Sequence, residues 1–172
     1  MRIALLGMTV ALAIAATAAK AEEKLLRVGM DIVDIATLDP HRTSSTGEKA
    51  VISWMFGGLV RFPPGSADPA AIEGDLAESW EHSPDGLVWT FKLRPGVRFH
   101  GDWGEATSAD VVYSLTRAAD PKRSSFSSTF ASIDKVEAPD PLTVRITLKE
   151  PVPSLLGLVS NYHGGMIVSA KA

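Results

Sequence analysis

Apolar and polar positions alternate with a period of two in residues 87–94 and 142–148. The apolar positions are Leu87, Trp89, Phe91 and Leu93 in the first stretch, and Leu142, Val144, Ile146 and Leu148 in the second. One apolar face and one mostly polar face are typical of a strand half-buried in a sheet. Ser83-Pro84-Asp85-Gly86 stands before the first stretch and favours a tight turn. The pattern therefore predicts a strand from residue 76, a turn and a second strand.

Shorter apolar runs predict further strands at residues 25–30, 59–62, 97–99, 133–137 and 166–168. Asp31, Gly58, Pro63, Gly96 and Gly165 stand next to four of these runs, and such residues favour turns over regular structure. Residues 66–75 contain no comparable run, and we expect a loose surface loop there.

Three segments have helical signals. Thr107-Ser108-Ala109-Asp110 fits a capping box, in which Asp110 accepts a hydrogen bond from the Thr107 amide. Behind it, Val111, Leu115 and Ala118 or Ala119 share one helical face. Residues 44–56 predict a second helix, capped by Ser45 or Thr46, with Glu48 in its first turn and with Val51, Ile52 and Met55 on one face. A short apolar helix is expected around residues 155–159.

Residues 1–21 have the pattern of a secretory signal peptide. Arg2 gives a positive start, residues 3–16 are mostly apolar, and Ala19-Lys20-Ala21 fits a small-residue cleavage site. The alternative is a membrane anchor, but the apolar run is shorter than the roughly 20 residues that a span needs. The chain has no Cys, so no lipid can be attached in the manner of bacterial lipoproteins. We expect a periplasmic protein.

Composition and motifs argue against several functions. The net charge is −3, and removal of residues 1–21 would make it −5 because Arg2 and Lys20 would be lost. A mildly acidic chain without a basic stripe does not suggest nucleic-acid binding. The sequence has no nucleophile elbow, zinc-protease, P-loop or dinucleotide motif, and its four His are isolated. We therefore expect no enzyme activity, no metal site and no cofactor.

One long segment resembles the signature region of the family 5 extracellular solute-binding proteins of ABC importers, the oligopeptide- and dipeptide-binding class. The matching stretches are Ala77-Glu78-Ser79-Trp80, Asp85-Gly86, Thr90-Phe91-Lys92-Leu93-Arg94, Phe99-His100 and residues 107–114. Leu38-Asp39-Pro40 is a second match, nearer the N-terminus. The chain departs from the family at residues 101–105, where a longer, Trp-containing loop replaces a short Asp-Gly-Thr-Pro segment.

The resemblance implies an α/β fold of the periplasmic-binding-protein type, type II, with two lobes. Residues 22–46 would be the first strand and loop of lobe one, residues 47–161 an inserted small mixed α/β domain, and residues 162–172 the return to lobe one. Lobe two would be absent from these 172 residues. The sequence leaves open whether it belongs to a fragment or to a truncated gene product.

The implied function is that of the solute-binding component of an ABC transporter, with peptides as the first expectation. A monomer would capture its ligand between two lobes and deliver it to permease subunits in the inner membrane. Two alternatives remain open. The same scaffold could bind a nickel complex, an opine or a sugar, or the chain could be a truncated interaction module without a transport function.

The resemblance also suggests ligand-binding residues. Thr43, Ser44, Ser45 and Thr46 follow the Asp-Pro-His turn and would line the cleft, where amides and hydroxyls can pair with an extended peptide. Alternatively, residues 44–46 only cap the following helix. Phe126 would be an aromatic ligand contact, or else a core partner of Phe130 four residues later. Among the four Trp, we expect Trp80 and Trp89 in the core and only Trp103 exposed.

Overall fold

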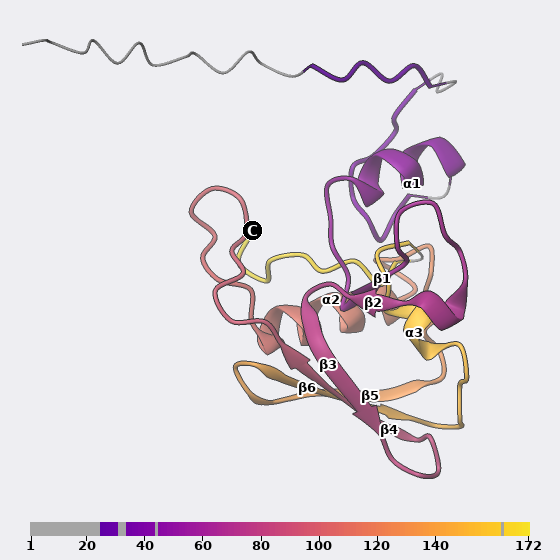
Figure 1. Ribbon diagram of the computed structural model, residues 1–172, viewed down its shortest axis with the longest axis vertical. Coiled ribbons are helices and arrows are strands. Elements are labelled where there is room, and N and C mark those ends of the chain that lie inside the picture. The colour runs from indigo at the N-terminus through magenta and orange to yellow at the C-terminus, as the bar shows by residue number, and fades with distance from the viewer. Residues whose placement is uncertain (1–24, 31–33, 44, 163) are drawn as a thin grey trace, which may run out of the picture.

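A four-stranded antiparallel sheet forms the centre of the computed structural model (Figure 1), which describes residues 25–30, 34–43, 45–162 and 164–172. The strands are β3 (Ala77–His82), β4 (Val88–Leu93), β5 (Ile133–Asp140) and β6 (Thr143–Leu148). Their order in the sheet is β3-β4-β6-β5. The predicted signal peptide, residues 1–21, and the predicted site residue Ser44 lie outside the described residues.

The predicted alternation is confirmed in the two central strands. Trp89, Phe91 and Leu93 of β4 are buried, as are Val144, Ile146 and Leu148 of β6. The register pairs Phe91 with Val144 and Trp89 with Ile146, so the apolar side chains of both strands lie on the same face of the sheet. The predicted turn is also present, since the Gly86 amide donates to the Ser83 carbonyl at 2.9 Å and Gly86 has a φ of 71°.

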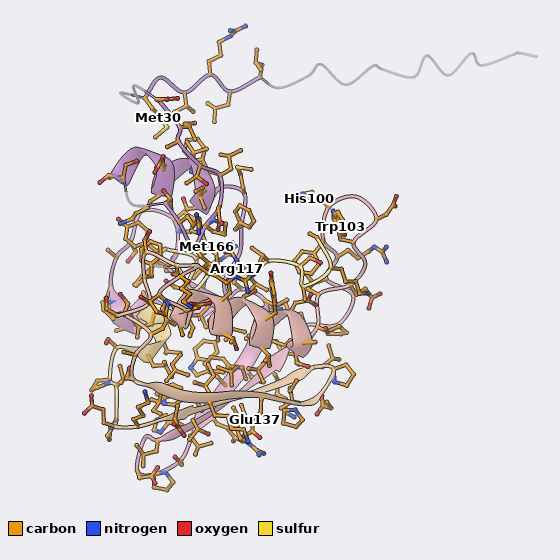
Figure 2. All side chains as sticks on the ribbon, turned by 180° about the vertical axis from the view of Figure 1, so that it is seen from behind. Met30, His100, Trp103, Arg117, Glu137 and Met166 are labelled. Carbon is orange, nitrogen blue, oxygen red and sulfur yellow. The ribbon has the colours of Figure 1, made fainter. Side chains whose placement is uncertain are left out.

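Helix α2 (Ser108–Ala119) covers this apolar face and packs on β5 and β6 (Figure 2). Val111, Leu115 and Ala118 are buried, as their spacing predicted. The Asp110 carboxylate accepts hydrogen bonds from the Thr107 amide at 2.9 Å and from the Thr107 hydroxyl at 3.0 Å. The capping interaction proposed from the sequence is therefore present.

Helix α1 (Thr46–Ser53) stands apart from the sheet in Figure 1 and is shorter than the predicted 44–56. Ser45 and Glu48 form its capping box. Ile52 is fully buried, but Trp54 and Met55 are 65% and 48% exposed. Residues 54–56 therefore lack the buried contacts that would stabilise a longer helix, and α1 ends at Ser53. The expectation that only Trp103 would be exposed among the Trp residues was therefore wrong, although Trp103 is indeed exposed.

The predicted loose loop at residues 66–75 is partly ordered. It contains η1 (Pro69–Ala71), a 3₁₀ turn that Asp68 caps by accepting from the Ala70 amide at 2.9 Å. It also contains β2 (Glu73–Gly74), which pairs with β1 (Val60–Arg61). Pairing with β1 orders this segment. The local sequence pattern of residues 66–75 did not indicate that pairing. Helix α3 (Leu155–Leu158) lies where it was predicted.

Three predicted strands are not present as strands. Residues 25–30 are exposed and pair with no strand of the described chain, and a strand requires a neighbour for its backbone groups. Residues 97–99 form only the single bridge Arg98–Glu105. Residues 166–168 belong to no strand, because the Ile167 amide bonds to the Gly57 carbonyl and the Val168 amide to the Ser114 hydroxyl.

The predicted strand at residues 133–137 is confirmed and extends to Asp140 as β5. Within the residues that the structure describes, no helix combines the length and the apolar character needed to cross a membrane.

Candidate functional site

The site is built on the turn that follows Leu38. The amides of Arg42 and Thr43 donate to the Asp39 carbonyl at 3.0 and 3.2 Å, and the Asp39 carboxylate accepts from the His41 amide at 3.0 Å. Pro40 fits this turn because its ring fixes φ near the turn value. The turn leads the chain toward α1 and places Thr43 two residues before Ser45, the N-cap of α1.

An ion-pair network attaches this turn to the rest of the fold. The guanidinium of Arg117, on α2, forms two hydrogen bonds with the Asp39 carboxylate at 2.8 and 2.5 Å. Its Nη1 also lies 2.6 Å from Nδ1 of His41, and Nε2 of His41 lies 3.1 Å from the Met166 carbonyl. Figure 2 shows Arg117 and Met166 side by side next to α2. Three distant segments therefore meet at one buried imidazole.

These contacts assign the tautomer of His41. An arginine is always a donor, so Nδ1 of His41 must be the acceptor and Nε2 must carry the proton donated to Met166. Burial lowers the pKa of His41, and the charge of Arg117 lowers it further, against the opposing hydrogen bond to Met166. Burial also disfavours the Asp39 carboxylate, but hydrogen bonds from Arg117 and the His41 amide outweigh it and lower the Asp39 pKa.

Glu48 organises the loop that contains the predicted ligand residues. Its carboxylate accepts from the Thr43 hydroxyl at 2.7 Å, the Ala36 amide at 2.9 Å and the Ser45 amide at 3.4 Å. The bond from Thr43 and then that from Ala36 lower the pKa of Glu48 from 4.5 to about 2. A charged Glu48 therefore holds residues 36, 43 and 45 together at neutral pH.

The predicted ligand residues have different environments. The Thr43 side chain is 1% exposed and its hydroxyl is bonded to Glu48. Ser45 and Thr46 are exposed at the start of α1, and the Ser45 hydroxyl accepts from the Glu48 amide at 3.2 Å. The alternative reading of this segment as a helix cap is therefore correct for Ser45. The loop still presents Ser45 and Thr46 to solvent.

Phe126 is 8% exposed and Phe130 is fully buried, and both belong to the core cluster. The Phe126 ring lies 5.4 Å from Nζ of Lys49, on α1, and next to Gly164, where an added Cβ would be 2.7 Å from the ring. Phe126 thus contributes to the core, as its alternative reading predicted. A role in ligand contact remains a prediction for it and for residues 43–46.

The structure brings the two predicted segments together. The Ser125 amide donates to the His41 carbonyl at 2.9 Å, and the Ser125 hydroxyl donates to the Arg42 carbonyl at 3.0 Å. A pocket of about 240 Å³ lies at this junction, lined by Arg42, Pro121, Lys122, Arg123, Ser124 and Ser125. Sequence reasoning missed this pocket, although the basic residues after His41 and Pro121 were a signal for it.

A larger hollow of about 550 Å³ lies elsewhere, between residues 55–58, the 97–106 loop and residues 167–172. Its lining is mostly apolar and includes Phe99 and Trp103. Figure 2 shows His100 and Trp103 together on the 97–106 loop. None of the predicted ligand residues lines this hollow. Within the described ranges, no three His, Asp or Glu side chains gather in a way that could hold a metal ion.

Comparison with known proteins defines the class. The family model described as bacterial extracellular solute-binding proteins, family 5 Middle, matches residues 71–172. The chain therefore belongs to family 5 of the bacterial extracellular solute-binding proteins. This confirms the resemblance drawn from residues 76–115, and the α/β fold is part of the type II periplasmic-binding-protein fold.

Individual relatives give a closer comparison. The chain is 36% identical over 169 residues to the glutathione-binding protein GsiB of Escherichia coli O1:K1, covering 96% of this chain and 31% of that protein. It thus spans about a third of the length of this curated relative. Among solved structures, the binding protein MoaA of A. tumefaciens R10, in complex with mannopinic acid, is 57% identical with a TM-score of 0.78, covering 80% of this chain and 28% of MoaA.

A third relative binds a peptide. DppA of Helicobacter pylori, in complex with the peptide STSA, is 30% identical with a TM-score of 0.68, covering 78% of this chain and 29% of DppA. The relatives found are thus binding proteins for different small solutes.

Proposed function

We propose that this chain is part of the solute-binding component of an ABC importer, with peptides as its first candidate ligands. The observation that carries the proposal is the contact of His41 and Arg42, just before the predicted ligand residues, with Ser125, just before Phe126, within a chain of family 5. The bound solute would lie between two lobes and be delivered to permease subunits in the inner membrane. The protein would act as a periplasmic monomer.

We propose the organisation that the resemblance to the family suggests. Residues 1–21 are a signal peptide, residues 22–46 begin lobe one, residues 47–161 are an inserted small domain, and residues 162–172 return to lobe one. The contact of the Met166 carbonyl with His41 supports the last assignment, because it brings residue 166 back to the segment 22–46. The second lobe would be supplied by protein beyond these residues.

Recognition would rest on polar contacts from the loop. Ser45 and Thr46 are exposed at the start of α1, and an extended peptide offers amides and carbonyls that hydroxyls and backbone groups can pair with. Binding and release of a solute need no covalent bond to be made or broken. We therefore propose a function without catalysis, metal or cofactor.

A second candidate ligand class is the opines. The 57% identity with MoaA, in complex with mannopinic acid, exceeds the 30% with the peptide-bound DppA. Peptides and opines are both small polar molecules with at least one carboxylate. The two classes of ligand therefore differ in the rest of the molecule. The lobe-one residues described here are compatible with either class.

The test is isothermal titration calorimetry on the protein as its host produces it. The ligands are the peptide Ser-Thr-Ser-Ala, glutathione, mannopinic acid and the nickel–histidine complex. Saturable binding of a peptide supports the first proposal, and binding of mannopinic acid alone supports the second. Binding of none, together with a protein partner recovered without any solute, would favour an interaction module.

A further inference from the structure

Four cationic side chains surround the junction of the two predicted segments. Arg42, Lys122 and Arg123 line the 240 Å³ pocket, and Lys49 lies over the neighbouring Phe126 ring. The whole chain is acidic, with a net charge of −3, so this concentration of positive charge is local. All three pocket cations are exposed to solvent, where a dissolved anion can reach them.

Two of the cations are held in place by uncharged partners. Nη2 of Arg42 donates to the Lys122 carbonyl at 3.2 Å, which links the two segments across the pocket. Nη2 of Arg123 donates to the Tyr113 hydroxyl at 2.8 Å, and its guanidinium lies 5.4 Å from the centre of the Tyr113 ring. Each guanidinium keeps further N–H groups beyond these bonds. The pocket is therefore lined by oriented donors that keep their full charge.

No described carboxylate forms an ion pair with these four cations; the ion pairs found in the described residues involve other Lys and Arg. The carboxylate in the same loop, Asp120, accepts from the Lys122 amide at 2.8 Å. Glu48 is occupied by Thr43, Ala36 and Ser45. The positive charge of the pocket is thus not neutralised by a contacting acid within the described protein.

The backbone donors around the pocket are already used. The amides of Arg123 and Ser124 donate to the Asp120 carbonyl, and that of Ser125 donates to the His41 carbonyl. The Arg42 amide donates to the Asp39 carbonyl. An anion in this pocket would consequently be bound by the cationic side chains, with the guanidinium geometry suited to a carboxylate.

We propose that this pocket binds a carboxylate group of the solute, through Arg42 and Lys122 with support from Arg123 and Lys49. The inference rests on the proposed function and deepens it, because it assigns the ligand an acidic group and places that group where Arg42 of lobe one meets Lys122 of the inserted domain. A pocket of about 240 Å³ has room for a carboxylate group. The ligand class is a small acid, which includes peptides with a free C-terminus and opines.

The experiment measures dissociation constants by calorimetry on the protein as its host produces it. Two acids, glutathione and mannopinic acid, are each compared with the derivative in which every carboxylate is a carboxamide. The test variant is Arg42→Gln with Lys122→Gln. The control variant is Arg145→Gln with Lys135→Gln, which removes two exposed cations from the sheet and changes the net charge equally.

We expect the test variant to bind the acid about tenfold or more weakly and the amide within about twofold of the unchanged protein, since the lost bonds are charge-assisted. The control variant should bind both within about twofold, and added salt should weaken acid binding more in the unchanged protein than in the test variant. Equal losses for acid and amide would overturn the proposal by showing that the residues only hold the loop.

Unaltered acid binding in the test variant would also overturn the proposal. If the unchanged protein binds none of the four solutes of the first titration and none of these amides, the proposed function itself fails, and this inference fails with it. That outcome is recognised before any variant is made, so the two failures are distinguishable. If the unchanged protein binds Ser-Thr-Ser-Ala alone, that peptide and its C-terminal amide are the pair compared in the two variants.

Discussion

Arg117 and Asp39 lie 78 residues apart in the sequence and form a two-pronged ion pair, with N–O distances of 2.8 and 2.5 Å. Their side chains are only 15% and 24% exposed. The same guanidinium contacts Nδ1 of His41 at 2.6 Å. One arginine on α2 therefore fixes the turn that precedes the predicted ligand loop.

We predict that Arg117→Met lowers the free energy of unfolding by about 2 kcal/mol, because it leaves a largely buried carboxylate without its cation. The matched control is Arg61→Met, which breaks an ion pair with Glu73 whose side chains are 48% and 43% exposed. That change should cost less than about 1 kcal/mol. Urea unfolding with unaltered m-values measures both. Equal losses in the two variants would contradict the structural importance assigned to Arg117.

His41 makes stability depend on pH. Its pKa is lowered from 6.5 in the folded state, so the unfolded chain binds a proton more readily than the folded one. The contribution of His41 to the free energy of unfolding is therefore fully present above pH 6.5. It is lost as the pH falls below 6.5, with a limiting slope of about 1.4 kcal/mol per pH unit. His41→Gln should flatten the profile of unfolding free energy between pH 7 and 5.

The groups that face the His41 ring are Arg117, Asp39 and the Met166 carbonyl, and Arg123 contributes a weaker charge. His100→Gln, at an exposed position in the 97–106 loop, is the control and should leave the slope intact. An identical slope in His41→Gln and in the unchanged protein would show that His41 is not the titrating group.

Glu48→Gln should destabilise the protein at pH 7, because the neutral amide cannot replace a carboxylate that accepts from Thr43, Ala36 and Ser45. The Glu48 pKa is lowered from 4.5 to about 2, so its contribution is present above 4.5 and is lost as the pH falls toward 2. The variant should lose less stability across that interval than the unchanged protein. Thermal unfolding between pH 5 and 2 tests this, with Glu78→Gln on the exposed side of β3 as control.

Gly164→Ala should cost more stability than Gly65→Ala. Both glycines have positive φ, 85° and 78°, so both substitutions carry the backbone penalty of about 1–2 kcal/mol. A Cβ added at Gly65 would meet open space, whereas one added at Gly164 would lie 2.7 Å from the Phe126 ring. We expect an additional cost of about 1–3 kcal/mol at Gly164.

Adding Phe126→Leu to Gly164→Ala should recover part of that additional cost, and a double-mutant cycle measures the coupling. Zero coupling between the two positions would mean that the ring moves aside freely.

Much of the sheet and of α2 could be predicted from the sequence. Trp89, Phe91 and Leu93 alternate because a strand turns successive side chains to opposite faces, and Thr107 and Asp110 are close enough in sequence to cap a helix by themselves. Residues 66–75 and 166–168 were predicted less well. Their conformation depends on β1, Gly57 and Ser114, which their own residues do not reveal.

The sequence by itself therefore determined the family, the strand faces and the helix caps, since each depends on residues a few positions apart or on an ordered motif. The tertiary structure alone decided that Asp39, His41, Arg117 and Met166 meet, and that Arg42 lies beside Lys122. The physical reason is the separation along the chain, which is 80 residues for Arg42 and Lys122 and 125 for His41 and Met166. Contacts over such distances arise from the packing of whole elements, which no local periodicity encodes.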